Sequence, residues 1–153
     1  MKIAGKTHIN QQGFTIIEMV VVLIVLSIVT TVIAYRPATV SNEIIAQAEI
    51  FKSHLRYAQI KAMNDTVPWG IHIPDANSYI LYEEGTDPAS DILPGETAQT
   101  HTMPSVVTIT SGVGSTYKFD EWGSPGTTTQ TITLSQGTTT SNITITKNTG
   151  YIP

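Results

Sequence analysis

Residues 13–35 read GFTIIEMVVVLIVLSIVTTVIAY. Between Phe14 and Tyr35 the only charged side chain is that of Glu18. A helix of about 20 apolar residues, rising about 1.5 Å per residue, crosses the roughly 30 Å hydrocarbon core of a bilayer. The segment therefore has the length and composition of a membrane-spanning helix, and we expect it to determine how the rest of the chain is organised.

A secretory signal and a buried core helix both fit this segment less well. A secretory signal cleaved after Val32-Ile33-Ala34 would use Lys2 and Lys6 as its basic region, but the apolar part of such signals is only roughly 7–15 residues long. A buried core helix would need apolar residues around it, and the remainder of the chain is polar and rich in Thr. Because Lys2 and Lys6 precede the segment, the amino terminus is expected inside the cell.

The overall composition excludes several classes of protein. The chain has 153 residues, a length for one domain, and its charged fraction of 13% is about half of the roughly 25% usual in soluble domains. The net charge is −4 and the cations form no row, which argues against binding to duplex nucleic acid. The absence of cysteine excludes thiol nucleophiles, disulfides and thiolate zinc sites.

The junction in front of the apolar segment is the most informative motif. The polar residues 10–12 are followed by Gly13 and Phe14, and Glu18 lies just inside the apolar run. This pattern resembles the class III signal of type IV pilins and type II secretion pseudopilins. In that family a prepilin peptidase cuts after the glycine and methylates the new amino terminus, and the glutamate serves in assembly. The resemblance implies cleavage between Gly13 and Phe14, N-methylation of Phe14 and an assembly role for Glu18.

Three short motifs later in the chain are similar to the GspH/FimT group of minor pilins and pseudopilins. They are LRYAQIKAMN at 55–64, FDEWGSP at 119–125 and ITITKNTGY at 143–151. The chain also lacks the paired carboxy-terminal cysteines of many major pilins, which fits this minor group better.

The region after the apolar segment begins with a second helical pattern. Pro37 removes a helical hydrogen bond, so the helix is expected to kink or pause there. From Ser41 onward, apolar residues recur at spacings of three and four, which predicts a helix packed on a sheet. The residues of this stripe are Ile44, Ala48, Phe51, Leu55, Ala58 and Ala62. The expected polar face carries Glu43, Gln47, Ser53, Arg56 and Gln59.

Alternating apolar residues predict strands in the rest of the chain. The expected strands include 67–73 and 79–83, joined by a turn at 74–77 into a hairpin. Further Thr-, Val- and Ile-rich runs are expected to form strands at 106–110, 116–119, 131–134 and 142–147. One helix followed by an antiparallel meander is the predicted arrangement.

Candidates for catalysis are few. His54, His72 and His101 are far apart in the sequence, without the HExxH or HxH spacing of metal ligands. No Gly-x-Ser-x-Gly turn or glycine-rich phosphate loop is present. We therefore expect no enzyme activity, no catalytic residue and no cofactor.

The acidic segment 83–96 reads as a solvated surface loop. Asp87, Asp91 and Glu96 offer the oxygen ligands that calcium uses, but their spacing does not match an EF-hand. They are weak calcium candidates, and no metal site is predicted. A role of this loop in partner recognition is compatible with either interpretation.

The predicted fold is α+β and pilin-like, with a long N-terminal helix whose first half is transmembrane and whose second half packs on a small antiparallel β-sheet. The expected parts are a prepilin leader at 1–13, a transmembrane and assembly helix at 14–36, and a periplasmic domain at 37–153. The resemblance implies a structural minor pilin or pseudopilin, in a type II secretion pseudopilus or a type IV pilus. The chain would pass once through the bacterial inner membrane and join a filament after assembly.

The implied partners are other pilins or pseudopilins, the prepilin peptidase and the inner-membrane assembly platform. A DNA-uptake minor pilin is one alternative, although past Pro37 five cations are dispersed among eleven acids, so nucleic acid is not expected as a partner. A single-pass membrane-anchored enzyme is another alternative, for which Gly13 and Glu18 would be dispensable.

Overall fold

Helix α2 (Val40–Asn64) carries the apolar stripe around which the carboxy-terminal part of the chain is built. The computed structural model describes residues 15–34 and 40–153, without the side chains of 32–34 and 40–42. Two compact units, Met1–Ala38 and Thr39–Pro153, divide the chain, and α2 belongs to the second. The predicted stripe is confirmed, because each of its residues is at most 3% exposed: Ile44, Ala48, Phe51, Leu55, Ala58 and Ala62. The expected kink at Pro37 lies outside the described residues.

The end of α2 is fixed by two polar side chains. Asn64 Nδ2 donates back to the Ile60 carbonyl in the last turn of the helix at 2.8 Å. Asp65 follows, and its carboxylate accepts from the Thr66 N–H at 2.6 Å and from Trp69 Nε1 at 3.0 Å. These bonds turn the chain out of the helix and orient Trp69 at the start of the first strand.

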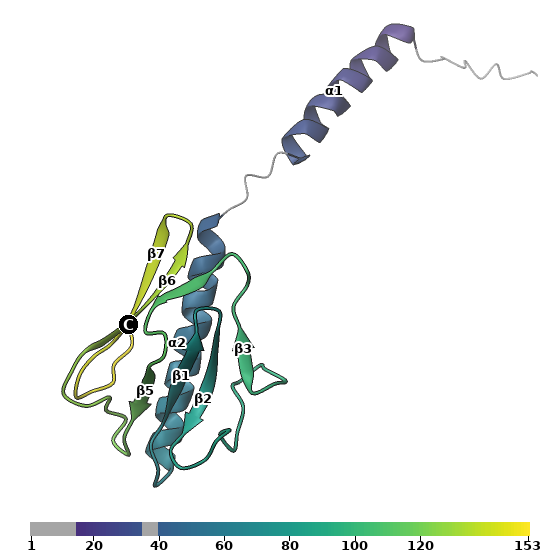
Figure 1. Ribbon diagram of the computed structural model, residues 1–153. Helices are drawn as coiled ribbons and strands as arrows, with labels where there is room; N and C mark the ends of the chain where they lie inside the picture. The colour runs from purple at the N-terminus through teal and green to yellow at the C-terminus, as the bar shows by residue number, and fades with distance from the viewer. Residues whose placement is uncertain (1–14, 35–39) are drawn as a thin grey trace, which may run out of the picture. The chain divides into compact units, whose positions relative to one another are not determined.

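One antiparallel sheet has the order β3-β2-β1-β5. Its hairpin joins β1 (Trp69–Asp75) to β2 (Ser78–Glu83) through a two-residue turn at 76–77, which is tighter than the predicted turn. The edge strands are β3 (Thr100–Thr102), which was not predicted, and β5 (Thr116–Phe119), which was predicted to the residue. Figure 1 shows β1 and β2 running along α2.

A second antiparallel sheet has the order β4-β6-β7, so the prediction of a single meander was wrong. Its strands are β4 (Thr108–Ser111), β6 (Gln130–Gln136) and β7 (Thr139–Ile145). The chain leaves this sheet between β4 and β6 to place β5 beside β1. Gly70 permits that pairing, because a Cβ atom at this position would overlap the Tyr117 carbonyl oxygen of β5.

The polar face of α2 is less exposed than predicted. Gln47 is only 8% exposed, and its Nε2 donates to Glu43 Oε1 at 3.3 Å. Nearby, the Ile44 N–H donates to Oε1 of Gln136 from β6 at 3.2 Å. The first turns of α2 are therefore covered by the second sheet, which a helix pattern alone could not indicate.

Leu55→Ala should lower the free energy of unfolding by about 2–5 kcal/mol, because Leu55 is fully buried and its loss leaves a cavity. Denaturant titration of the full chain in uncharged detergent, followed by the fluorescence of buried Trp69, measures the change. Ser53→Ala, at an exposed position of the same helix, is the control and should change stability by less than about 0.5 kcal/mol. Equal effects of the two substitutions would show that the faces of α2 are wrongly assigned.

Candidate functional site

The apolar helix α1 (Ile16–Ala34) begins at a capped amino terminus. Thr15 Oγ1 accepts from the Glu18 N–H at 3.3 Å, and the Thr15 carbonyl accepts from the Glu18 and Met19 N–H groups at 3.1 and 3.2 Å. Thr followed three residues later by Glu is the sequence of a capping box. A carboxylate in the first turn is also favoured by the helix dipole. Glu18 thus occupies a position that suits an acidic side chain even within a single helix.

The rest of the described α1 surface is apolar and exposed on all sides. Every side chain from Thr15 to Thr31 is exposed. The hydroxyls of Ser27, Thr30 and Thr31 donate back to carbonyls four residues earlier, at 2.7, 2.7 and 2.8 Å. They therefore leave no unpaired hydroxyl donor on this part of the helix surface. A helix that is apolar all round is stable when lipid or other protein segments cover it, so we expect lipid or protein to cover α1.

The expected processing site is the bond between Gly13 and Phe14. Gly13 and Phe14 lie outside the described residues, as do residues 35 and 36 at the far end of the expected span. Within the described ranges, no helix combines the length and the apolar character needed for crossing a membrane. Among the same residues, no side chain forms an ion pair with Glu18.

The acidic segment 83–96 is an exposed loop along most of its length, as predicted, but it is also fastened to the domain at several points. Asp91 accepts from the Tyr57 hydroxyl at 2.5 Å and pairs with Lys61 at 2.8 Å. Lys61, followed by Tyr57, lowers the pKa of Asp91 to about 2. Leu93 is 1% exposed and joins the core. The segment is therefore fastened to α2 by charge, hydrogen bonding and apolar burial together.

The three weak calcium candidates are not brought together. Asp91 is bound to α2, whereas Glu96 Oε1 lies 2.6 Å from Nδ1 of His101 in β3. Asp87 lines a separate pocket beside β1 and β2. In the described part of the chain, no group of three or more His, Asp or Glu side chains is arranged to hold a metal ion.

A buried cluster around His54 joins the same segment to α2 and the sheet. His54 Nε2 lies 3.1 Å from the Pro94 carbonyl, and Nδ1 lies 2.8 Å from the Tyr79 hydroxyl. Because a carbonyl can only accept, Nε2 donates to Pro94, and in the neutral imidazole Nδ1 then accepts from the Tyr79 hydroxyl. Tyr79 stacks on His101 with ring centroids 4.6 Å apart. Burial is the main cause that lowers the pKa of His54.

Sequence analysis found no metal-ligand spacing around His54 and gave no indication of this cluster. The available signal was its position, three residues after Phe51 and four before Ala58, which places it beside the buried stripe. Its partners come from a loop and two strands, so the helix pattern gives no indication of them.

The domain should lose stability as the pH falls below about 6.5, because unfolded His54 then binds a proton that the folded state resists. One such group contributes at most about 1.4 kcal/mol per pH unit. The measurement is the free energy of unfolding between pH 7.5 and 5. His54→Gln cannot titrate and should flatten this dependence; an unchanged slope in that variant would place the acid sensitivity elsewhere.

The three short motifs from the later part of the chain meet at one side chain. Gln59 Nε2 donates to the Gly123 carbonyl at 2.7 Å and to the Gly150 carbonyl at 3.1 Å. Gly150 has φ 63°, and a Cβ atom there would overlap the Gly123 carbonyl oxygen. Arg56 adds a bond to the Ile152 carbonyl at 3.0 Å. The motifs therefore fasten two loops to α2, which is a structural role.

Known proteins are similar to this chain in an amino-terminal sequence motif and in the fold of most of its length. Residues 9–34 match the prokaryotic N-terminal methylation motif. A search of curated protein sequences finds no significant match. Among solved structures, the minor pseudopilin EpsH from the type 2 secretion system of Vibrio cholerae is similar with a TM-score of 0.54 and 12% identity, covering 72% of this chain and 94% of EpsH. The chain has a type IV pilin-like fold.

A second solved structure supports this fold. The type IV minor pilin FimU of Pseudomonas aeruginosa is similar with a TM-score of 0.53 and 20% identity, over 76% of this chain and 91% of FimU. Along the chain, a methylation motif and an exposed apolar helix precede a compact α+β domain.

Proposed function

We propose that this chain is a minor pilin or pseudopilin, a structural subunit of a type IV pilus or a type II secretion pseudopilus. The proposal rests mainly on the surface of α1. This helix lies within the matched methylation motif and exposes apolar side chains on all sides. Lipid would cover this surface before assembly, and the corresponding helices of neighbouring subunits would cover it in a filament. The partners are other pilins or pseudopilins and the inner-membrane assembly platform.

In this proposal, residues 1–13 are a leader and the prepilin peptidase cleaves between Gly13 and Phe14. The mature chain would be anchored in the inner membrane by 14–36, with residues 37–153 in the periplasm. No observation favours an enzyme or a DNA-uptake role. Of the cations past Pro37, Lys52, Lys61 and Lys118 already pair with acids of the same domain.

Processing is tested by intact mass spectrometry of the membrane-extracted chain from a host that has the peptidase. The expected mass is that of residues 14–153 with one added methyl group, because the apolar helix is retained. The Gly13→Leu variant is the control and should keep the full-length mass. A chain beginning at Tyr35 would contradict the proposal, because an ordinary signal peptidase would then have removed the helix.

Glu18→Leu should abolish assembly without preventing membrane insertion. A carboxylate near a membrane is costly without a partner, and the amino group of processed Phe14 on a neighbouring subunit is the expected partner. An ion pair at about 4 Å and an effective dielectric of about 20 gains about 4 kcal/mol before desolvation. The readouts are membrane fractionation, co-purification with other pilins, and secretion or piliation.

Two further variants separate this ion pair from the capping role of Glu18. Gln can replace Glu in a capping box but carries no charge, so Glu18→Gln should fail in assembly as Glu18→Leu does. Normal assembly of Glu18→Gln would mean that capping is sufficient. Ser27→Ala removes only a bond within the helix and serves as the control that should assemble normally.

A further inference from the structure

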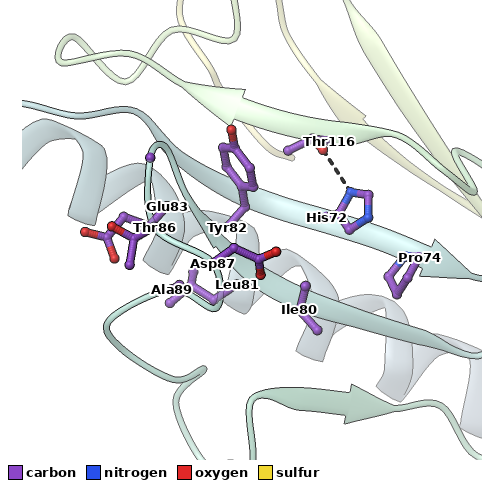
Figure 2. A pocket seen from close by; sticks show the side chains of 11 residues that line it. His72, Pro74, Ile80, Leu81, Tyr82, Glu83, Thr86, Asp87, Ala89 and Thr116 are labelled. Atoms are coloured by element: carbon purple, nitrogen blue, oxygen red, sulfur yellow. Dashed lines mark hydrogen bonds between the residues drawn. The ribbon is translucent and has the colours of Figure 1, made fainter.

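A pocket of about 520 Å³ lies beside β1 and β2 and is unrelated to the helix α1. Its floor is formed by the face of the sheet opposite α2: Trp69, Ile71 and Ile73 are buried toward the helix, so the alternating His72 and Pro74 face the other way. The segment after β2 forms the opposite wall (Figure 2). A cavity of this size is in the range of about 300–1,000 Å³ typical of ligand sites.

The walls of the pocket combine apolar surface with negative charge. Pro74, Ile80 and Tyr82 supply the apolar part. Asp87 and Glu83 supply two carboxylates, while no lysine or arginine is among the lining residues. Figure 2 shows the Asp87 carboxylate directed from the loop toward the strands that carry Ile80 and His72. The pocket is therefore complementary in charge to a cation that also has flat apolar surface.

Asp87 differs from the other acids of its segment. Asp91 and Glu96 are occupied by Lys61 and His101. Glu83 Oε2 accepts from the Ser90 N–H at 2.6 Å, which holds the loop in place over the sheet. In the described part of the chain, no cationic side chain forms an ion pair with Asp87. Its charge is thus available to a group from outside the chain.

The shape and chemistry favour a guanidinium group over an ammonium group. Arginine is planar, has only donors, pairs with carboxylates through two parallel bonds and packs flat on aromatic rings. Tyr82, Pro74 and Ile80 supply apolar surface to the pocket that Asp87 also lines. Lys118 Nζ lies 5.6 Å from the centroid of the Tyr82 ring, so this ring already accommodates a cation. An arginine side chain fills only part of the cavity, which leaves room for the adjoining residues of a peptide.

We propose that this pocket receives an arginine side chain from a segment of a partner protein, with Asp87 pairing the guanidinium and Tyr82 packing against it. His72, which also lines the pocket, is held in position by its contact with Thr116, whose Oγ1 lies 2.8 Å from Nδ1. The inference is independent of the filament role, since it concerns a different surface and different residues.

The test is a nuclear magnetic resonance titration of the ¹⁵N-labelled full chain in uncharged detergent. The probe is the peptide acetyl-Gly-Arg-Gly-amide, and its citrulline analogue has the same shape without the charge. The arginine peptide should cause saturable shifts of the amides at 72, 83–87 and 89, with a dissociation constant on the order of millimolar. The citrulline peptide should not. Equal binding of the two peptides, or no saturable shift, would overturn the proposal.

Two charge-matched variants locate the site. Asp87→Asn should weaken binding of the arginine peptide at least about tenfold, because it removes the charged acceptor. Glu121→Gln removes one acid at an exposed position outside the pocket and should bind as the wild type does. Equal weakening in both variants would mean general attraction by net charge, and calcium-induced shifts of the same amides would mean a metal site; either result overturns the proposal. Unchanged amide signals in the rest of the domain confirm the fold of each variant.

Discussion

The burial of one stripe of α2 beneath two sheets is the interaction on which the rest of the domain depends. The helix contacts β1 and β5 of one sheet and β6 and β7 of the other. Sheets of four and three strands have little apolar surface that they could bury alone, so both need the same helix. Leu55, Ala58 and Ala62 lie at the centre of this contact and are fully buried. Loss of the stripe would uncover both sheets at once.

The two described helices of the chain differ in how their apolar surface is satisfied. In α2 the domain covers the core stripe completely, while Ile45, Ile50, Ile60 and Met63 outside the stripe stay exposed. In α1 the apolar surface surrounds the helix and remains exposed from Ile16 to Val29. The carboxy-terminal unit buries its core and exposes single apolar side chains such as Trp122 and Tyr151, whereas α1 exposes a continuous apolar surface. The helix α1 is thus available for assembly, and the core of the carboxy-terminal unit forms without it.

The features that could be predicted from the sequence are those set by local pattern. The helical period identified the stripe of α2, and a Thr- and aromatic-containing run identified β5 to the residue. β3 was missed because its three residues are too few to show an alternating pattern. The pairing of β1 with β5 depends on Gly70 and on residues more than forty positions away, so it is invisible to local reasoning. The polar contacts of His54 and Asp91 were missed for the same reason.

Outside the core stripe, α2 also contacts several loops. The side chains that make these contacts are again spaced three and four residues apart. His54, Tyr57 and Lys61 form a row that holds the acidic segment. Arg56, Gln59 and Met63 form another row, against which the loops around Gly123 and Gly150 pack. Each row follows the direction in which residues three and four apart become neighbours on a helix.

The middle of α2 nevertheless keeps an exposed strip, which includes Glu49, Ser53, Arg56 and Ile60. The three short motifs at 55–64, 119–125 and 143–151 thus have a structural role, because they hold two loops against α2. A neighbouring molecule can reach α2 along this strip. Contacts made elsewhere on the domain must involve its loops or the outer faces of its sheets.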